Sequence, residues 1–236
     1  MLQVKPIKTS IFRAGDDLVQ FLKEHLQGES VEGHIVAVTS KIVSLAENRL
    51  VPISEISKEE LIKKESDVYL GPCGYDCHLT IKEGLLIPSA GIDESNSEVG
   101  NFILYPNSPF DSAKYLVQKL RKNLGVEQLG VILTDSKTSP LRTGVGGVAL
   151  AYYGFRGVKS LIGTEDLFGR PLKNTKLNIA DTLAAAATLC MGEGSESCPI
   201  AIIKYPVEFI ETQNNDEIRV APSNDLYWSL LQDKKR

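Results

Sequence analysis

Three short polar segments of this chain each follow an apolar run that predicts a buried strand. They are Thr39-Ser40-Lys41, "AGIDESN" at residues 90–96, and Thr134-Asp135-Ser136. Loops that follow strands are where α/β proteins place ligands, so these segments are candidate parts of one site. Asp93 and Asp135 each have a hydroxyl group nearby, and such oxygens are the hard ligands that suit Mg²⁺ or Mn²⁺. The alternative is that both aspartates only cap helices or turns, and spacing alone favours that alternative.

A glycine-rich stretch, "SPLRTGVGGVALAYYGFRG", occupies residues 139–157. Its glycines would let the backbone come close to a ligand, and Arg142 and Arg156 could pair with a phosphate or a carboxylate. The stretch is neither a Walker A loop nor a GxGxxG dinucleotide turn. A bend or bulge where the chain enters the next strand explains the glycines nearly as well.

Histidines and cysteines offer little support for other chemistries. The chain has no GxSxG elbow, and its histidines lie far in sequence from the polar strand ends: His25, His34 and His78. "CGYDCH" could be half of a zinc site, but Cys190 and Cys198 lack the matching spacing. We therefore expect reduced thiols and no zinc, and we expect a reaction driven by metal ions and electrostatics.

Composition bounds the class of protein. The chain has 236 residues, 42% of them hydrophobic and 24% charged, with a net charge of −4. These values predict one globular domain over 1–236, in one unit or two lobes, and they argue against nucleic acid as a partner. The N-terminus lacks the apolar core of a signal peptide, and the apolar helical stretch 182–191 is too short to span a bilayer. We expect a cytoplasmic protein without a membrane partner.

Hydrophobic periodicity predicts a mixture of helices and strands. The stretch 34–47 opens as a strand and continues as a helix, and 77–91 reads as a hairpin that turns at 82–84. The remaining expected elements are helices over 16–26, 57–66, 108–125 and 178–193, and strands over 129–136, 147–155 and 199–210. The helix over 178–193 is nearly all apolar, which predicts that it is buried. The fold class expected is α+β, a mixed α/β arrangement.

Taken in order, the motifs resemble one protein family. They are "VTSKIVSLAENR" (38–49), "AGIDESN" (90–96), "LTDS" (133–136), "PLRTGVGGVALAYYGFRG" (140–157), "DLFGRPL" (166–172) and "NIADTLAAAATLCMGEG" (178–194). Their order and spacing are similar to those of the coenzyme F420-0:γ-glutamyl ligases, from about residue 9 to about residue 204. The resemblance implies an α+β fold of two lobes and an intertwined homodimer with the nucleotide near the subunit interface.

The resemblance also implies an activity. Members of the family join L-glutamate to a carboxylate of the coenzyme F420 precursor, with GTP as co-substrate and Mn²⁺ or Mg²⁺ as the metal; K⁺ is a further candidate ion. A carboxylate is a poor acyl donor, so an acyl phosphate would form first and the amine of glutamate would then displace phosphate. Positioning and charge neutralisation would do most of this work, which fits the lack of a conspicuous nucleophile.

Residue roles follow from the resemblance by motif. The implied ligands of a first metal ion are Asp93 and Asp135, and those of a second are Ser136 and Glu193. The implied nucleotide contacts are Thr9, Ser10, Ile11, Phe12, Ser40, Lys41, Asn96, Met191, Gly192 and Gly194. The candidate catalytic residues are Asp93, Asp135, Lys41 and Arg142, the last two as cations that balance phosphate charge.

Three positions depart from the pattern of the family. Leu45 stands where many members have a lysine, "TSPLR" replaces the usual "GRPWR", and Ile162 replaces an arginine. We therefore expect metal and nucleotide binding to persist while the acceptor is open. F420-0 is the leading acceptor, a folate or another carboxylate coenzyme is the alternative, and a nucleotide-binding homologue without ligase activity is a third possibility.

Overall fold

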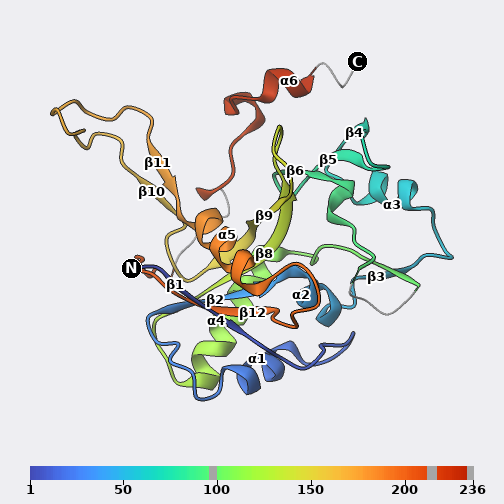
Figure 1. The fold of residues 1–236 in the computed structure, drawn as a ribbon, viewed down its shortest axis with the longest axis horizontal. Helices are drawn as coiled ribbons and strands as arrows, with labels where there is room; N and C mark the ends of the chain where they lie inside the picture. The colour runs from blue at the N-terminus through green and yellow to red at the C-terminus, as the bar shows by residue number, and fades with distance from the viewer. Residues whose placement is uncertain (96–99, 212–216, 233–236) are drawn as a thin grey trace.

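The computed structural model describes residues 1–95, 100–211 and 217–232 (Figure 1). It confirms the α+β class, with helices set around several separate sheets. The helices are α1 Leu18–Leu26, α2 Ser40–Ala46, α3 Lys58–Glu65, α4 Pro109–Leu124, α5 Ile179–Met191 and α6 Trp228–Gln232, with short 3₁₀ turns η1 Ser89–Gly91 and η3 Pro222–Asn224. The strands are β1 Gln3–Ile7, β2 His34–Thr39, β3 Leu50–Pro52, β4 Val68–Pro72, β5 His78–Lys82, β6 Leu85–Pro88, β7 Asn101–Ile103, β8 Leu129–Thr138, β9 Val145–Tyr153, β10 Val158–Ser160, β11 Lys176–Asn178 and β12 Ile200–Lys204.

The main sheet has five strands in the order β1-β12-β2-β8-β9. Only β2 and β8 run parallel; the other neighbours are antiparallel. Helices α1 and α4 lie on one side of this sheet and α5 on the other (Figure 1). Because both faces are covered, β2 and the first part of β8 are almost continuously apolar and buried.

A smaller layer lies beside the main sheet, where the sheet β4-β5-β6 and helix α3 stand apart from it (Figure 1). A separate apolar cluster there includes Leu61, Ile62 and Phe102. The hairpin expected at 77–91 is confirmed as β5 and β6 with its turn at Glu83 and Gly84. Strands β10 and β11 form the base of an arm that extends away from the main sheet (Figure 1).

Helix ends follow the expected local signals. Asp17 caps α1 by accepting a hydrogen bond from the backbone of Gln20 at 3.0 Å. Ser57 and Glu60 form the expected capping box of α3. Helix α4 ends at Gly125, which adopts the left-handed conformation with φ of 68°.

Two expectations about the C-terminal third were wrong. Helix α5 is buried on one face only; Leu189 on the other face is 85% exposed. Its many alanines made it apolar without supplying a second face that packs on the sheet. The run 199–210 is a strand only over 200–204, because Pro206 cannot donate a ladder hydrogen bond. Beyond this strand, the rest of the run pairs through an isolated bridge between Phe155 and Phe209.

Described residues beyond 216 contact both layers. The Glu217 carboxylate accepts hydrogen bonds from the Tyr152 hydroxyl at 2.6 Å and from the Gly157 backbone at 3.1 Å. Arg219 pairs with Glu83 of the β5–β6 turn and lies over the ring of Phe110 in α4, 5.3 Å from its centroid. This segment therefore ties the smaller layer to the main sheet. No helix among the described residues is long and apolar enough to cross a bilayer.

Candidate functional site

A cavity of about 810 Å³ lies at the carboxyl end of the parallel pair β2–β8. Nearly all of the site residues inferred from the sequence line it: Thr9, Ser10, Ile11, Phe12, Ser40, Lys41, Asp93, Asp135, Ser136, Met191, Gly192, Glu193 and Gly194. Asn96 is outside the described residues. Segments that are up to 185 residues apart in sequence thus surround one hollow, although the role of each residue stays a prediction.

The register of the parallel pair brings two of the polar strand ends together. Thr39 is level with Thr134, so Ser40 and Asp135 are the next residues on each chain. The Ser40 hydroxyl lies 3.4 Å from Oδ1 of Asp135 and donates to it. Strand β2 ends here and becomes α2, while β8 continues to Thr138. Carboxyl ends of parallel strands therefore deliver these side chains to the cavity, as expected.

Asp135 lies at the inner side of the cavity with protein atoms around most of its carboxylate. Oδ2 accepts a short hydrogen bond from the Tyr105 hydroxyl, and Oδ1 accepts the long one from Ser40. Burial raises the pKa of Asp135 to about 6, although these hydrogen bonds and the nearby Lys41 act in the opposite direction. Burial, together with the Asp135 charge, raises the pKa of Tyr105 well above its ordinary value.

Asp93 is held in a turn just after η1. Its backbone pairs with Ile103 through hydrogen bonds of 3.0 and 2.8 Å. Its Oδ1 accepts from the backbone N–H groups of Glu94 and Ser95 at 2.6 and 2.8 Å, which is an Asx turn. Burial alone would raise the pKa of Asp93, but its hydrogen bonds to Lys41 and Ser95 and the Lys41 charge outweigh it and lower the pKa.

The Lys41 ammonium group sits among oxygens of this turn. Its Nζ lies 2.6 Å from Oδ2 of Asp93, 2.9 Å from the Ser95 carbonyl and 3.2 Å from the Ser95 hydroxyl. Lys41 is in the first turn of α2, so it spans from the main sheet to the smaller layer. The oxygens of Asp93 and Ser95 thus surround one positive charge, and a bound metal cation would need similar oxygen partners.

A second polar pair lies on the other side of β8. The Ser136 hydroxyl is 2.8 Å from each oxygen of the Glu193 carboxylate. Successive residues of a strand point to opposite faces, so Asp135 faces Tyr105 while Ser136 faces the loop after α5. Nearby, the Thr188 hydroxyl lines the cavity, is buried, and has no hydrogen-bond partner among the described residues.

The donor set fits hard divalent cations. Among the described residues no group of three His, Cys, Asp or Glu side chains gathers as a metal cage. Carboxylate and hydroxyl oxygens from Asp93, Asp135, Ser136 and Glu193 instead line one cavity. Mg²⁺ is typically bound by one or two carboxylates together with water and substrate phosphates, so a full protein cage is not required. Asp135, partly buried and with a raised pKa, is also a carboxylate whose negative charge a cation would compensate.

The two arginines of the glycine-rich stretch are not brought to the cavity. Arg142 is exposed in the loop between β8 and β9 and is not among the residues that line the cavity. Arg156 pairs with Glu208 at 2.7 Å on another part of the surface. The proposed role of Arg142 as a phosphate cation therefore has no support from its position in this structure.

The cysteine motif of the smaller layer also lies apart from the cavity. Cys73 is exposed and Cys77 is partly buried, and neither lines the cavity. The neighbouring His78 shares a 2.7 Å hydrogen bond between its Nδ1 and the Tyr69 hydroxyl.

Sequence reasoning missed Tyr105 and the packing that holds it. Nothing in "NFILYPNS" marks a functional residue, although a tyrosine in an apolar run must find a partner for its hydroxyl when it is buried. For the glycine-rich stretch, the structural alternative accounts for Gly147: a Cβ there would lie 2.4 Å from the Thr188 hydroxyl oxygen, so this glycine allows close packing with α5.

The departures from the family pattern fall in two places. Leu45 is buried and lines the cavity, and Thr138 lines it at the end of β8. Ile162 is 50% exposed on the arm that follows β10. The first two therefore change the lining of the cavity, whereas the third changes the surface of the arm.

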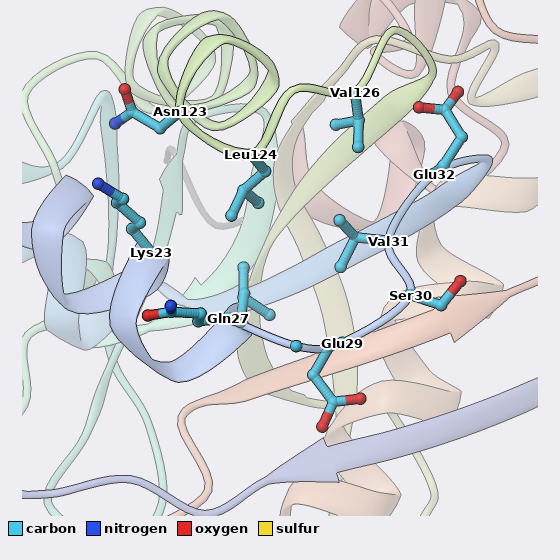
Figure 2. A pocket seen from close by; sticks show the side chains of 11 residues that line it. Lys23, Gln27, Glu29, Ser30, Val31, Glu32, Asn123, Leu124 and Val126 are labelled. Carbon is cyan, nitrogen blue, oxygen red and sulfur yellow. The ribbon is translucent and has the colours of Figure 1, made fainter.

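A second hollow of about 390 Å³ lies at the opposite, amino end of the β2–β8 pair (Figure 2). The C-terminal ends of α1 and α4 and the loop 27–32 surround it. Its charged side chains are Lys23, Glu29 and Glu32, and none of the expected site residues line it. The chemistry indicated by the sequence therefore belongs to the larger cavity.

Comparison with known proteins matches this chain to a family. A family model described as F420-0:Gamma-glutamyl ligase matches residues 6–205. Coenzyme F420:L-glutamate ligase of Methanopyrus kandleri is 34% identical over 251 aligned positions, which cover 96% of this chain and 97% of that protein. The proteins of the same name from Methanothermobacter thermautotrophicus (34% identical; 82% and 84% covered) and Methanocaldococcus jannaschii (33% identical; 92% and 94% covered) are also similar. The chain therefore belongs to the F420-0:gamma-glutamyl ligase family.

Proposed function

We propose that this protein joins L-glutamate to the carboxylate of coenzyme F420-0 through an acyl phosphate, with GTP as phosphoryl donor and Mn²⁺ or Mg²⁺ as the metal. The observation that carries this proposal is the convergence of Asp93, Asp135, Lys41 and the Ser136–Glu193 pair on one cavity. Family membership supports the glutamate ligation, and the oxygen-rich lining supports a metal-bound nucleotide. We further propose that the active form is a homodimer in the cytoplasm.

In the first step a carboxylate oxygen of the acceptor attacks the γ-phosphorus of GTP. The bond from this phosphorus to the β-phosphate oxygen breaks, and GDP leaves. Asp93, Asp135, Ser136 and Glu193 would hold the divalent ions, whose charge lets the two anions come together. Lys41 would turn from Asp93 and Ser95 towards the phosphates, which its long, flexible side chain allows.

In the second step the amine nitrogen of L-glutamate attacks the acyl carbon. The bond from that carbon to the phosphate oxygen breaks, inorganic phosphate leaves, and the nitrogen loses a proton as the amide forms. The protein contributes chiefly by placing the reacting groups and excluding water, so the proposed steps need no nucleophilic side chain.

One observation favours a second acceptor. Leu45 puts a buried apolar side chain into the cavity where many members of the family have a lysine. An apolar surface there would suit a different acceptor, such as a folate or another carboxylate coenzyme. The reaction chemistry would be the same for either acceptor.

The direct test is product formation with each acceptor. Purified protein with Mn²⁺, GTP and L-glutamate is given F420-0 or a folate in separate reactions, and phosphate release and product mass are measured. We expect a mass increase of one glutamyl residue on F420-0, with GDP and phosphate formed in equal amounts. Glutamylation of the folate alone would establish the second acceptor. Nucleotide binding without phosphate release under both conditions would contradict the ligase proposal.

A further inference from the structure

Tyr105 connects the smaller layer to the main sheet at the cavity. It follows β7, is 4% exposed, and packs with Ile87 of β6 and Leu150 of β9 in a small apolar cluster. Its hydroxyl donates to Oδ2 of Asp135. A buried ring from one layer thus ends on a carboxylate of the other.

The ring lies directly on the backbone of η1. Gly91 has φ of 70°, and a Cβ added there would be 2.3 Å from two ring carbons of Tyr105. Ser89 and Ala90 also have positive φ, 51° and 54°, which costs on the order of 1 kcal/mol for each residue. Thr80 stabilises this turn by accepting a hydrogen bond from the Ala90 N–H at 2.9 Å. The turn is therefore built so that the ring can approach it closely.

The backbone of Tyr105 is fixed as well. Its carbonyl accepts a hydrogen bond of 2.9 Å from Nε of Arg49, and Arg49 is itself paired with Glu65 at 2.8 Å. The tyrosine is therefore anchored at its carbonyl, along its ring and at its hydroxyl. Such anchoring leaves the phenol oxygen little freedom to move away from Asp135.

We propose that Tyr105 is a positioning residue for the divalent metal ion, which it controls through Asp135. The inference rests on the proposed role of Asp135 as a metal ligand. The Tyr105 hydroxyl occupies Oδ2 and fixes the plane of the carboxylate. Oδ1 accepts the long 3.4 Å hydrogen bond from the Ser40 hydroxyl, and the Ser136 backbone also hydrogen-bonds to the carboxylate. Oδ1 is therefore held less tightly by side chains than Oδ2, and it is the oxygen that we assign to the cation. Partners that orient metal-ligating carboxylates typically contribute about 10–100-fold to metal affinity.

The test compares two tyrosine variants in the full-length protein. Tyr105→Phe removes only the hydroxyl group. Tyr152→Phe is the matched control, because Tyr152 is also fully buried and also donates to a carboxylate, Glu217 at 2.6 Å, but does not line the cavity. Mn²⁺ affinity is measured from the electron paramagnetic resonance signal of free Mn²⁺, and thermal unfolding without metal is recorded for each protein.

We expect Tyr105→Phe to bind Mn²⁺ about 10–100-fold more weakly than the wild type, and Tyr152→Phe to bind it within twofold of the wild type. Both variants should lose similar stability, so a general loosening of the fold would not separate them. In turnover assays Tyr105→Phe should raise the Mn²⁺ concentration for half-maximal activity by a similar factor, with little change in kcat at saturating metal.

Affinity of Tyr105→Phe within twofold of the wild type would overturn the positioning role. A fall in affinity of the same size in both tyrosine variants would overturn it too, because the effect would then be structural. Asp135→Asn separates this outcome from failure of the proposed function. If Asp135→Asn binds Mn²⁺ as tightly as the wild type, Asp135 is not a ligand, and the metal assignment and the positioning role both fail.

Discussion

At the scale of single residues, the two aspartates of the cavity have opposite electrostatic environments. Asp135 has its pKa raised by burial to about 6, whereas the pKa of Asp93 is lowered by Lys41 and Ser95. A raised carboxyl pKa means that the folded state favours the protonated form. The favourable contribution of Asp135 to folding is therefore complete below its unfolded pKa, near 3.8, and is lost as pH rises through about 6.

Asp135→Asn should consequently stabilise the metal-free protein at pH 8. The amide keeps the shape of the carboxyl group and carries no charge, so the cost of burying the ionised form disappears. We expect the free energy of unfolding to rise by about 1–3 kcal/mol at pH 8 and the gain to vanish below about pH 4. The measurement is denaturant unfolding followed by circular dichroism from pH 4 to pH 8, with a chelator present.

Asp93→Asn serves as the comparison, because it should change the free energy of unfolding in the opposite direction. A lowered pKa contributes stability above the unfolded value that is lost as pH falls, so this variant should be less stable than the wild type at neutral pH. A loss of stability for Asp135→Asn at pH 8 would contradict the environment described for Asp135.

Residue-level prediction from sequence worked where a residue carries its own chemical signal. Asp93 and Asp135 were candidates because each follows an apolar run, and Glu193 because of the family resemblance; all three line the cavity, and their roles stay predictions. Tyr105 was not found, because its role depends on a partner 30 residues away and on the shape of the η1 turn. Neither leaves a pattern in the local sequence.

At the scale of elements, the packing of β9 on α5 sets the width of the cavity at Glu193. Gly147 in β9 lies opposite Ser136 in β8. A Cβ on Gly147 would be 2.7 Å from the Ala184 carbonyl and 2.4 Å from the Thr188 hydroxyl. Helix α5 can therefore approach the sheet closely only because this residue is glycine.

Gly147→Ala should push α5 away from β9. We expect a loss of about 1–3 kcal/mol in stability from overpacking, and weaker Mn²⁺ binding because Glu193 moves with the end of α5. Gly146→Ala is the matched control, since a Cβ there meets nothing within 4 Å. Equal effects of the two substitutions on unfolding and Mn²⁺ titrations would show that the glycines act through backbone freedom instead of packing.

Element prediction succeeded where end signals or long periodic runs were present. Asp17, Ser57 and Gly125 are cap residues of α1, α3 and α4 that can be recognised in the sequence, and β8 contains a long apolar run. The three-residue strands β3, β10 and β11 were missed because three residues are too few to show a period. The half exposure of α5 was missed because composition does not reveal which face is covered.

At the scale of the whole molecule, the segment after β12 holds the two layers together without touching the cavity. None of the described residues beyond 205 line the cavity. Arg219 in this segment pairs with Glu83 of the smaller layer and stacks on Phe110 of the larger one. The relative position of the layers, and with it the meeting of Tyr105 and Asp135, depends in part on this segment.

Arg219→Ala should lower the free energy of unfolding by about 1–3 kcal/mol, because it leaves a partly buried Glu83 without its ion pair and removes the stacking contact. Arg170→Ala is the matched control: Arg170 also has an ion pair, with Asp166, and stacks on Phe168, but it is exposed on the arm. Its loss should cost less than about 0.5 kcal/mol. Similar values for both variants in denaturant unfolding would contradict the bridging role of Arg219.

The position of the tryptophan in this last segment also determines what the intrinsic fluorescence of the protein measures. The chain has one tryptophan, Trp228, and it lies in α6 (Figure 1). Indole fluorescence therefore reads the surroundings of α6, and a shift in its emission on heating marks the release of the C-terminal segment. The chain has eight tyrosines; Tyr227 is adjacent to Trp228, whereas others such as Tyr69 in β4 and Tyr152 in β9 belong to the two layers. Indole emission thus records α6 alone, and phenol emission is a record weighted towards the two layers.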